Sequence, residues 1–96
     1  MAIWPVNIAG NPAAFVAVLQ PTAPVGTVYA DSGDAVYWNN TTTETHQISL
    51  LVATQNKGVV TPDHQSDAFF VTGNSGDTIP YNCLLHPEMK GTIVVT

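Results

Sequence analysis

The sequence carries very little charge, and least of all positive charge. Of its 96 residues, 2 are Lys or Arg and 7 are Asp or Glu, which gives a formal net charge of −5. Binding to nucleic-acid phosphates depends on clustered Lys and Arg, so the composition argues against a nucleic-acid-binding protein. It argues equally against docking on an anionic membrane surface, whereas a basic protein partner would be attracted.

Cysteines and long apolar runs are equally scarce. The single cysteine, Cys83, excludes an internal disulfide bond. No apolar run approaches the roughly 18–20 residues of a membrane-spanning helix, so we expect no membrane insertion. The N-terminus, Met1–Pro5, lacks the basic and apolar regions of a secretory signal. We expect residues 1–96 to form a single domain, because a chain of this length has room for one.

What the sequence does contain is a regular alternation of turn residues and short apolar runs. Clusters of Gly, Pro, Asn, Asp, Ser and Thr punctuate the chain at 10–12, 21–24, 31–34, 39–43, 56–58 and 73–76. The β-branched and aromatic runs between them predict strands at Ile3–Ile8, Ala14–Gln20, Thr27–Ala30, Ala35–Asn39, Gln47–Ala53, Ala68–Val71, Thr78–Cys83 and Gly91–Val95. Seven or eight short strands with regular turns are typical of an all-β sandwich or barrel. The best helical segment, Thr61–Gln65, predicts one short turn at most.

Strand periodicity distinguishes a buried histidine, His46, from a surface histidine, His64. Alternate residues of a strand share a face, so His46 lies in line with the apolar residues Ile48, Leu50 and Val52. We therefore expect His46 to point into the core at the entry of its strand. His64 lies in a segment of Pro, Asp, Gln and Ser without such a pattern, and we interpret it as a surface residue.

The C-terminal segment holds the closest grouping of potential metal ligands in the chain. Ile79 and Tyr81 share a strand face that Cys83 continues, so the thiol is expected to point inward at the exit of its strand. His86 and Met89 follow at intervals of three residues. A thiolate, an imidazole and a thioether thus lie on one short loop. Each residue alone is more typical of a packed core than of a site, but together they indicate a metal centre.

The donor types favour copper. Soft sulfur with imidazole is the copper donor set, with two His and one Cys in a trigonal plane and a weak, long axial Met. The C-terminal loop supplies three of these donors, and His46 can supply the fourth from another strand. Zinc sites usually use further Cys or His, and calcium or magnesium requires several oxygen ligands. We therefore predict one copper ion held by His46, Cys83, His86 and Met89.

Two segments resemble the cupredoxins, the small type 1 blue copper proteins. Tyr81–Val95 resembles their C-terminal ligand loop and last strand, and its Cys-x2-His-x2-Met spacing is closer to amicyanin and pseudoazurin than to plastocyanin. Upstream, Gly33–Asn40 followed by His46 resembles the strand that leads to the family's first histidine ligand. The resemblance covers most of residues 14–96. It implies a Greek-key β-sandwich, which our strand count puts at seven to eight strands, with one bound copper ion.

Three features differ from the family's usual pattern. Gln47 follows the first ligand, where the family commonly has an Asn that ties the two ligand loops together. Leu84 and Leu85 stand in place of a polar residue and Pro, and Glu88 stands where an apolar residue is common. These residues adjoin the ligands, so they bear on copper's reduction potential and on ligand orientation.

The resemblance implies a carrier of single electrons rather than an enzyme, in the periplasm or otherwise outside the cytoplasm. His86 lies between Leu84-Leu85 and Pro87, so we expect its ring edge to reach the surface through a small apolar patch. Such patches mark interaction sites, and redox encounters use small interfaces. The expected partner is a redox protein with a basic docking face, Glu88 is expected to help attract it, and the carrier itself is expected to be a monomer.

Other function classes stay open. A small copper enzyme would need an axial side open to water or to a small molecule such as nitric oxide, and the unusual Gln47 and Glu88 leave room for it. A copper storage or delivery protein would favour exposed Met- or Cys-rich sites, but the chain has only Met1 and Met89. A Cys–His hydrolase would need an oriented base and a substrate cleft, which this arrangement does not clearly offer.

Overall fold

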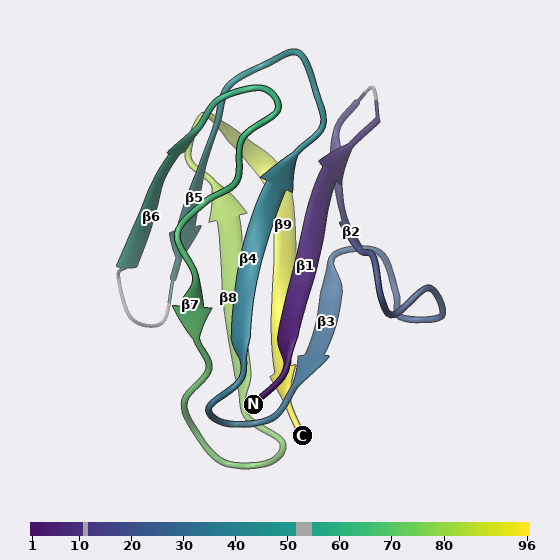
Figure 1. Ribbon diagram of the computed structural model, residues 1–96, viewed down its shortest axis with the longest axis vertical. Helices are drawn as coiled ribbons and strands as arrows, with labels where there is room; N and C mark the ends of the chain where they lie inside the picture. The colour runs from purple at the N-terminus through teal and green to yellow at the C-terminus, as the bar shows by residue number, and fades with distance from the viewer. Residues whose placement is uncertain (11, 52–54) are drawn as a thin grey trace.

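The protein is built from short strands, as the computed structural model shows for residues 1–10, 12–51 and 55–96 (Figure 1). The strands are β1 (Ile3–Ala9), β2 (Ala14–Ala17), β3 (Thr27–Ala30), β4 (Ala35–Asn40), β5 (His46–Leu50), β6 (Gln55–Val60), β7 (Phe69–Phe70), β8 (Thr78–Cys83) and β9 (His86–Val95). The described residues form no helix, and so the described chain holds no helix that could cross a membrane. The all-β prediction is confirmed.

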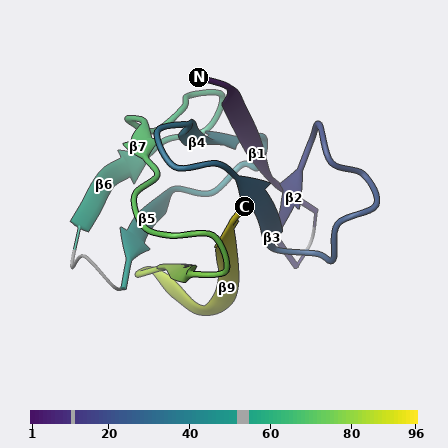
Figure 2. The ribbon, with the colours of Figure 1, turned by 90° about the horizontal axis from the view of Figure 1, so that it is seen from below.

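The strands form two sheets that pack face to face. One sheet has the order β2-β1-β4-β7 and the other the order β3-β9-β8-β5-β6. Both sheets are mixed, because β1 runs parallel to β4 and β3 runs parallel to β9. Figure 2 shows the layers from below, with β1 and β4 on one side and β9 on the other. Both chain termini lie at the end of the molecule opposite the point where β8 finishes (Figure 1).

Large aromatic side chains fill the space between the sheets. Phe15, Trp38 and Tyr81 are each at most 1% exposed. The ring centroids of Phe15 and Tyr81 lie 4.9 Å apart, those of Trp38 and Tyr81 lie 5.1 Å apart, and both pairs meet edge to face. This geometry is favoured by the ring quadrupoles and adds to the apolar area that the rings bury. Tyr81 therefore lies at the centre of the core.

Tyr81 also links three strands through its hydroxyl group. The hydroxyl donates to the carbonyl oxygen of Gly26 over 2.7 Å, and burial raises the pKa of Tyr81, so the donor stays protonated. Opposite Tyr81 on β9 lies Gly91, and a Cβ atom there would overlap the Tyr81 ring and the Gly26 carbonyl oxygen. Only glycine leaves space for this contact between β3, β8 and β9.

The inward orientation predicted for two candidate ligands is confirmed. His46 and Cys83 are both 0% exposed, and they belong to the same buried face as Ile48 and Leu50. Val52, which was assigned to this face as well, lies outside the described residues. Strand alternation thus carries one imidazole and one thiol into the end of the core.

The predicted strand Gln47–Ala53 is confirmed over Gln47–Leu50 and wrong at Leu51. Strand β5 already ends at Leu50, Leu51 lies in a turn, and residues 52–54 lie outside the described residues. The predicted turn at 56–58 is instead part of β6, which pairs with β5 in the antiparallel sense. Because β6 is an edge strand, backbone hydrogen bonds to one neighbour suffice to hold it, and its polar sequence gives no strand signal.

The predicted strand Ala14–Gln20 is too long, because β2 ends at Ala17. Gln20 has a different role, since its side-chain amide pairs with the main chain of Tyr29 on β3. Its Nε2 donates to the Tyr29 carbonyl over 2.7 Å, and the Tyr29 N–H donates to Oε1 over 2.8 Å. The side chain therefore takes the place of a strand residue along the outer edge of β3.

The C-terminal strand starts five residues earlier than predicted. Strand β9 begins at His86, which pairs with Cys83 across a two-residue turn, Leu84-Leu85. The register is irregular between Asn82 and Cys83, because Asn82 pairs with Lys90. The residues between His86 and Lys90 therefore form a bulge, the kind of irregularity that tolerates the missing N–H of Pro87.

The helical candidate Thr61–Gln65 forms a turn rather than a helix. The N–H of His64 donates to the carbonyl of Thr61 over 3.1 Å, and Asp63 has a φ of 63°. This left-handed value ends any helical path after Pro62, and Asp is one of the residue types that tolerate it.

We predict that Gly91→Ala destabilises the protein by about 1–3 kcal/mol or more, because the added methyl group overpacks the contact with Tyr81. Tyr81→Phe is the matched control. It removes one hydrogen bond, but the Gly26 carbonyl keeps the N–H of Thr92 as a donor, so the loss is about 0.5–1.5 kcal/mol. Urea unfolding curves measure both values. A smaller loss for Gly91→Ala than for Tyr81→Phe would contradict the tight packing.

Candidate metal centre

Three side chains meet where β5 and β9 begin and β8 ends. Strand β8 lies between the other two in the sheet, as Figure 1 shows. Cys83 pairs with Ile48 of β5 on one side and with His86 of β9 on the other. Because His46 opens β5 two residues before Ile48, both imidazoles flank the thiol.

The distances between these groups suit a single metal ion. Nδ1 of His46 lies 3.5 Å from the Cys83 Sγ, and Nδ1 of His86 lies 3.6 Å from it. A ligand atom from each of the three residues lies within 4.8 Å of the other two. Nitrogen and thiolate ligands bind first-row ions at about 2.0–2.3 Å, so three donors in a plane stand about 3.5–4.0 Å apart. The two nitrogen–sulfur separations fit a metal ion held by these three donors.

Burial differs sharply among the three donors. His46 and Cys83 expose no surface, whereas the His86 side chain is 31% exposed. The two imidazole rings lie close together, with centroids 4.8 Å apart. Burial lowers the pKa of His46, the nearby His86 lowers it further, and Glu44 acts in the opposite direction. His46 is therefore held as a neutral imidazole, the form that binds metals.

The main chain of Gln47 ties the two ligand segments together. Its N–H donates to the Cys83 Sγ over 3.4 Å, and its carbonyl accepts from the N–H of Leu84 over 2.8 Å. These bonds do not depend on the side chain at position 47. The replacement of the family's usual Asn by Gln47 therefore leaves this main-chain link between the ligand segments in place.

Two further residues touch the imidazoles on their outer sides. The Thr42 Oγ1 lies 3.1 Å from Nε2 of His46, and a carboxylate oxygen of Glu44 lies 3.2 Å from Nε2 of His86. Thr42 was predicted only as part of the polar turn at 39–43, and Glu44 was not predicted as a site residue. The available signal was their position in the short connection that leads directly to His46.

Met89 is a further side chain of this region, on the wall of the same cavity as His46 and His86. It is 7% exposed and belongs to the hydrophobic core. Together with His46 and His86, it borders a surface cavity of about 660 Å³. The rest of the cavity wall comes from the turn before β2, the connection from β4 to β5, and the charged residues Glu88 and Lys90.

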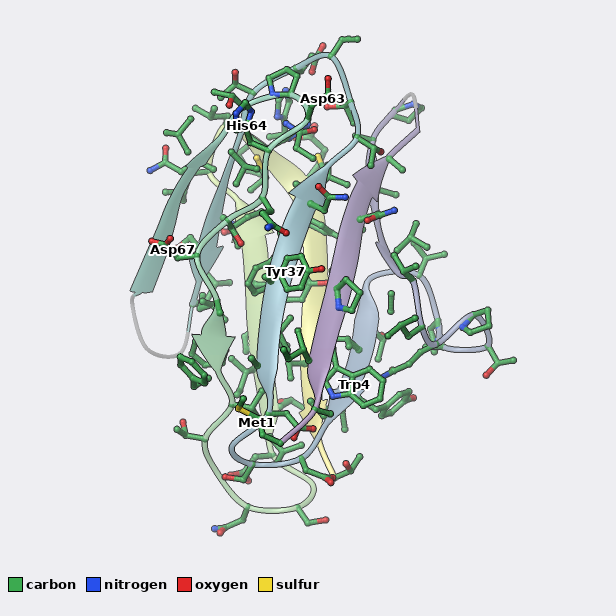
Figure 3. All side chains as sticks on the ribbon, viewed as in Figure 1. Met1, Trp4, Tyr37, Asp63, His64 and Asp67 are labelled. Atoms are coloured by element: carbon green, nitrogen blue, oxygen red, sulfur yellow. The ribbon has the colours of Figure 1, made fainter. Side chains whose placement is uncertain are left out.

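His64 lies at the same end of the molecule and does not join the group. It is exposed, and its Nδ1 lies 3.0 Å from the Thr61 Oγ1 and 2.9 Å from the Pro62 carbonyl oxygen. Figure 3 shows it beside Asp63, on the connection from β6 to β7. Within residues 1–10, 12–51 and 55–96, the cluster His46–Cys83–His86 is the one group of three or more His, Cys, Asp and Glu side chains that could hold an ion.

Comparison with solved structures identifies the fold. A Cu(I) structure of an amicyanin mutant with Met replaced by Ala matches with a TM-score of 0.70 and 20% identity, over 99% of this chain and 82% of amicyanin. A reduced Cu(I) form of a Pro-to-Gly amicyanin mutant at pH 4 gives 0.70 and 21%, with the same coverage. An oxidised amicyanin with Met replaced by Leu gives 0.70 and 19%, over 96% and 80% of the two chains.

The sequence itself gives no such match. No family model matches the chain, and no curated protein matches it. The similarity therefore lies in the three-dimensional arrangement, and the chain has the cupredoxin fold of amicyanin. The fold expected from the sequence resemblance is confirmed.

Proposed function

We propose that this protein is a type 1 copper protein that carries single electrons. The observation that carries the proposal is the pair of imidazole nitrogens, each within 3.6 Å of one buried thiol. Among the matching amicyanins are Cu(I), reduced and oxidised forms, which supports a redox-active copper in this fold. In the proposal His46, Cys83 and His86 would hold the copper ion, with the Met89 thioether as a further, weaker ligand.

Each donor has a separate task in this proposal. Copper, when bound, supplies a one-electron couple between Cu(I) and Cu(II). Cys83 and His46 keep water away from the centre, because neither exposes any surface. His86 is the most exposed of the four side chains and offers the shortest route for an electron to the surface. A fixed set of buried donors suits transfer without rearrangement.

An apolar rim around His86 supports docking of a redox partner at this point. Leu84 is 46% exposed, Leu85 is 51% exposed, and Pro87 is exposed beside them. Glu44 and Glu88 add negative charge to the same end of the molecule. We infer a small, quickly released interface with a partner that presents a basic face, and a monomeric carrier working outside the cytoplasm.

The enzyme alternative finds less support in the site. An open axial position would require a route for a small molecule to the metal ligands. The cavity beside the site is bordered by His46, His86 and Met89, but His46 and Met89 are almost fully buried and Cys83 is not part of the cavity wall. We therefore keep electron transfer as the function that this geometry supports best.

Addition of Cu(II) to the purified metal-free protein tests the copper assignment. We expect an intense visible band from thiolate-to-copper charge transfer, together with a type 1 paramagnetic spectrum. Cys83→Ser should abolish the band because it removes the thiolate. His64→Ala is the matched control and should keep the band. A colourless wild-type product would refute the proposal, and loss of colour in His64→Ala would refute the choice of histidines.

Substitution of Met89 tests whether its thioether is a copper ligand. A thioether favours Cu(I) more than an oxygen donor does. We therefore expect the reduction potential to fall in Met89→Gln and to rise in Met89→Leu, as measured by voltammetry. Equal potentials in all three proteins would show that Met89 is not a metal ligand and would favour Glu88 or water in its place.

Substitution of Leu85 tests the docking surface. We expect Leu85→Arg to slow electron transfer to a basic cytochrome, because it places a positive charge on the apolar rim, while the visible spectrum stays unchanged. Ile3→Arg is the control, since Ile3 is 55% exposed at the opposite end of the molecule. Stopped-flow rates over a salt series measure the effect. Equal slowing in both variants would place the docking surface elsewhere.

A further inference from the structure

The connection from β4 to β5 contacts both imidazoles on the side away from Cys83. Thr42 reaches Nε2 of His46, and Glu44 reaches Nε2 of His86. A neutral imidazole carries its single ring proton on either Nδ1 or Nε2, and the hydrogen bond at one nitrogen decides which. The protons of this network can be assigned from its donors and acceptors alone.

The side-chain amide of Asn40 provides a fixed starting point. Asn40 is 0% exposed, and its Nδ2 lies 2.7 Å from the carbonyl oxygen of Glu44 and 2.8 Å from that of Val60. Carbonyl oxygens only accept, so the amide nitrogen must face them and the amide cannot be flipped. The Oδ1 atom therefore faces Thr42, whose N–H donates to it over 2.9 Å.

The Thr42 hydroxyl group has one proton, and it donates this proton in a hydrogen bond to an oxygen acceptor. Its Oγ1 lies 2.7 Å from Asn40 Oδ1, a distance that is favourable only with a proton between the two oxygens. The other oxygen near it, the Glu44 carbonyl at 3.1 Å, is also only an acceptor, so the hydroxyl proton goes to an oxygen in either case. The shorter distance favours Asn40, and the hydroxyl lone pairs accept from the N–H of Glu44 and from Nε2 of His46. The ring proton of His46 must then lie on Nε2, which leaves Nδ1 with a lone pair facing the thiol.

The same reasoning applies to His86 with a simpler partner. An ionised carboxylate only accepts hydrogen bonds, so Nε2 of His86 must donate to Glu44 over 3.2 Å. Nδ1 of His86 then also carries a lone pair, 3.6 Å from the Cys83 Sγ. Glu44 is 68% exposed, so this contact is weaker than the one made by Thr42.

We propose that Thr42, supported by buried Asn40, and Glu44 are positioning residues that hold both histidines as the Nε2–H tautomer before any metal arrives. Both Nδ1 lone pairs then face Cys83 in the metal-free protein, and binding requires no tautomer change or ring rotation. That this arrangement serves copper rests on the function proposed above, whereas the tautomers themselves do not depend on it.

Long-range proton–nitrogen NMR spectra of the metal-free protein test the tautomers directly. At about pH 8, where an imidazole of ordinary pKa is neutral, we expect the Nε2–H form for both His46 and His86. In Thr42→Val the acceptor is lost, so His46 should shift toward the Nδ1–H form, and Thr42→Ser should restore the wild-type signals. Thr43→Val, at an exposed neighbouring threonine, is the control and should leave both rings unchanged.

Competition with a Cu(I) chelator measures the consequence for metal binding. Loss of a hydrogen-bonding partner of a ligating His typically costs 10–100-fold in affinity, so we expect a loss of about this size for Thr42→Val and recovery in Thr42→Ser. For Glu44→Ala the loss should stay below about fivefold, because the pair is exposed. Glu88→Ala removes the same charge near the cavity and should change Cu(I) affinity less than Glu44→Ala.

The tautomer proposal and the copper-function proposal are contradicted by different results. A wild-type protein whose His46 carries its proton on Nδ1 overturns the tautomer assignment. A folded Thr42→Val protein that binds Cu(I) as tightly as wild type overturns the positioning role of Thr42. A protein with both Nε2–H tautomers that gives no charge-transfer band with Cu(II) overturns the copper function and leaves the positioning role standing.

Discussion

The site depends on one constraint, the pairing of β8 with β5 on one side and with β9 on the other. This pairing puts Cys83 at the meeting point of the two strands that begin with His46 and His86. Because alternate side chains of a strand face opposite sides, a slip of one residue in either register would turn a donor out of the cluster. The core contacts of Tyr81, two residues before the thiol, hold β8 in this register.

The sequence was informative wherever the relevant signal is local. Strand alternation predicts the inward direction of His46 and Cys83, and the three-residue spacing brings His86 back to the thiol through a short hairpin. It was uninformative where the contact depends on how a loop folds back. Thr42 and Glu44 reach the imidazoles only through the hydrogen bonds around Asn40, and their position just before His46 is the one signal of this in the sequence. Strand β6 was missed for a related reason, because its partner rather than its composition makes it a strand.

The candidate centre combines a closed interior with one opening. Cys83 belongs to the hydrophobic core and the fully buried His46 lies beside it, so changes around them are transmitted to the close-packed interior. His86 lies at the boundary, with an apolar rim on one side and the Glu44 carboxylate on the other. Under the proposed function, the same few residues would meet two demands that usually compete, a rigid set of donors and a surface for a transient partner.

The Gln20 amide that completes the edge of β3 has a consequence for how the molecule behaves at high concentration. An unpaired strand edge offers N–H and C=O groups to any other extended chain, and natural proteins block such edges to prevent intermolecular sheet growth. By occupying both main-chain groups of Tyr29, Gln20 blocks one outer edge of the five-stranded sheet with a single side chain. With few charged side chains to keep copies apart, this local block counts against pairing of β3 with a second copy.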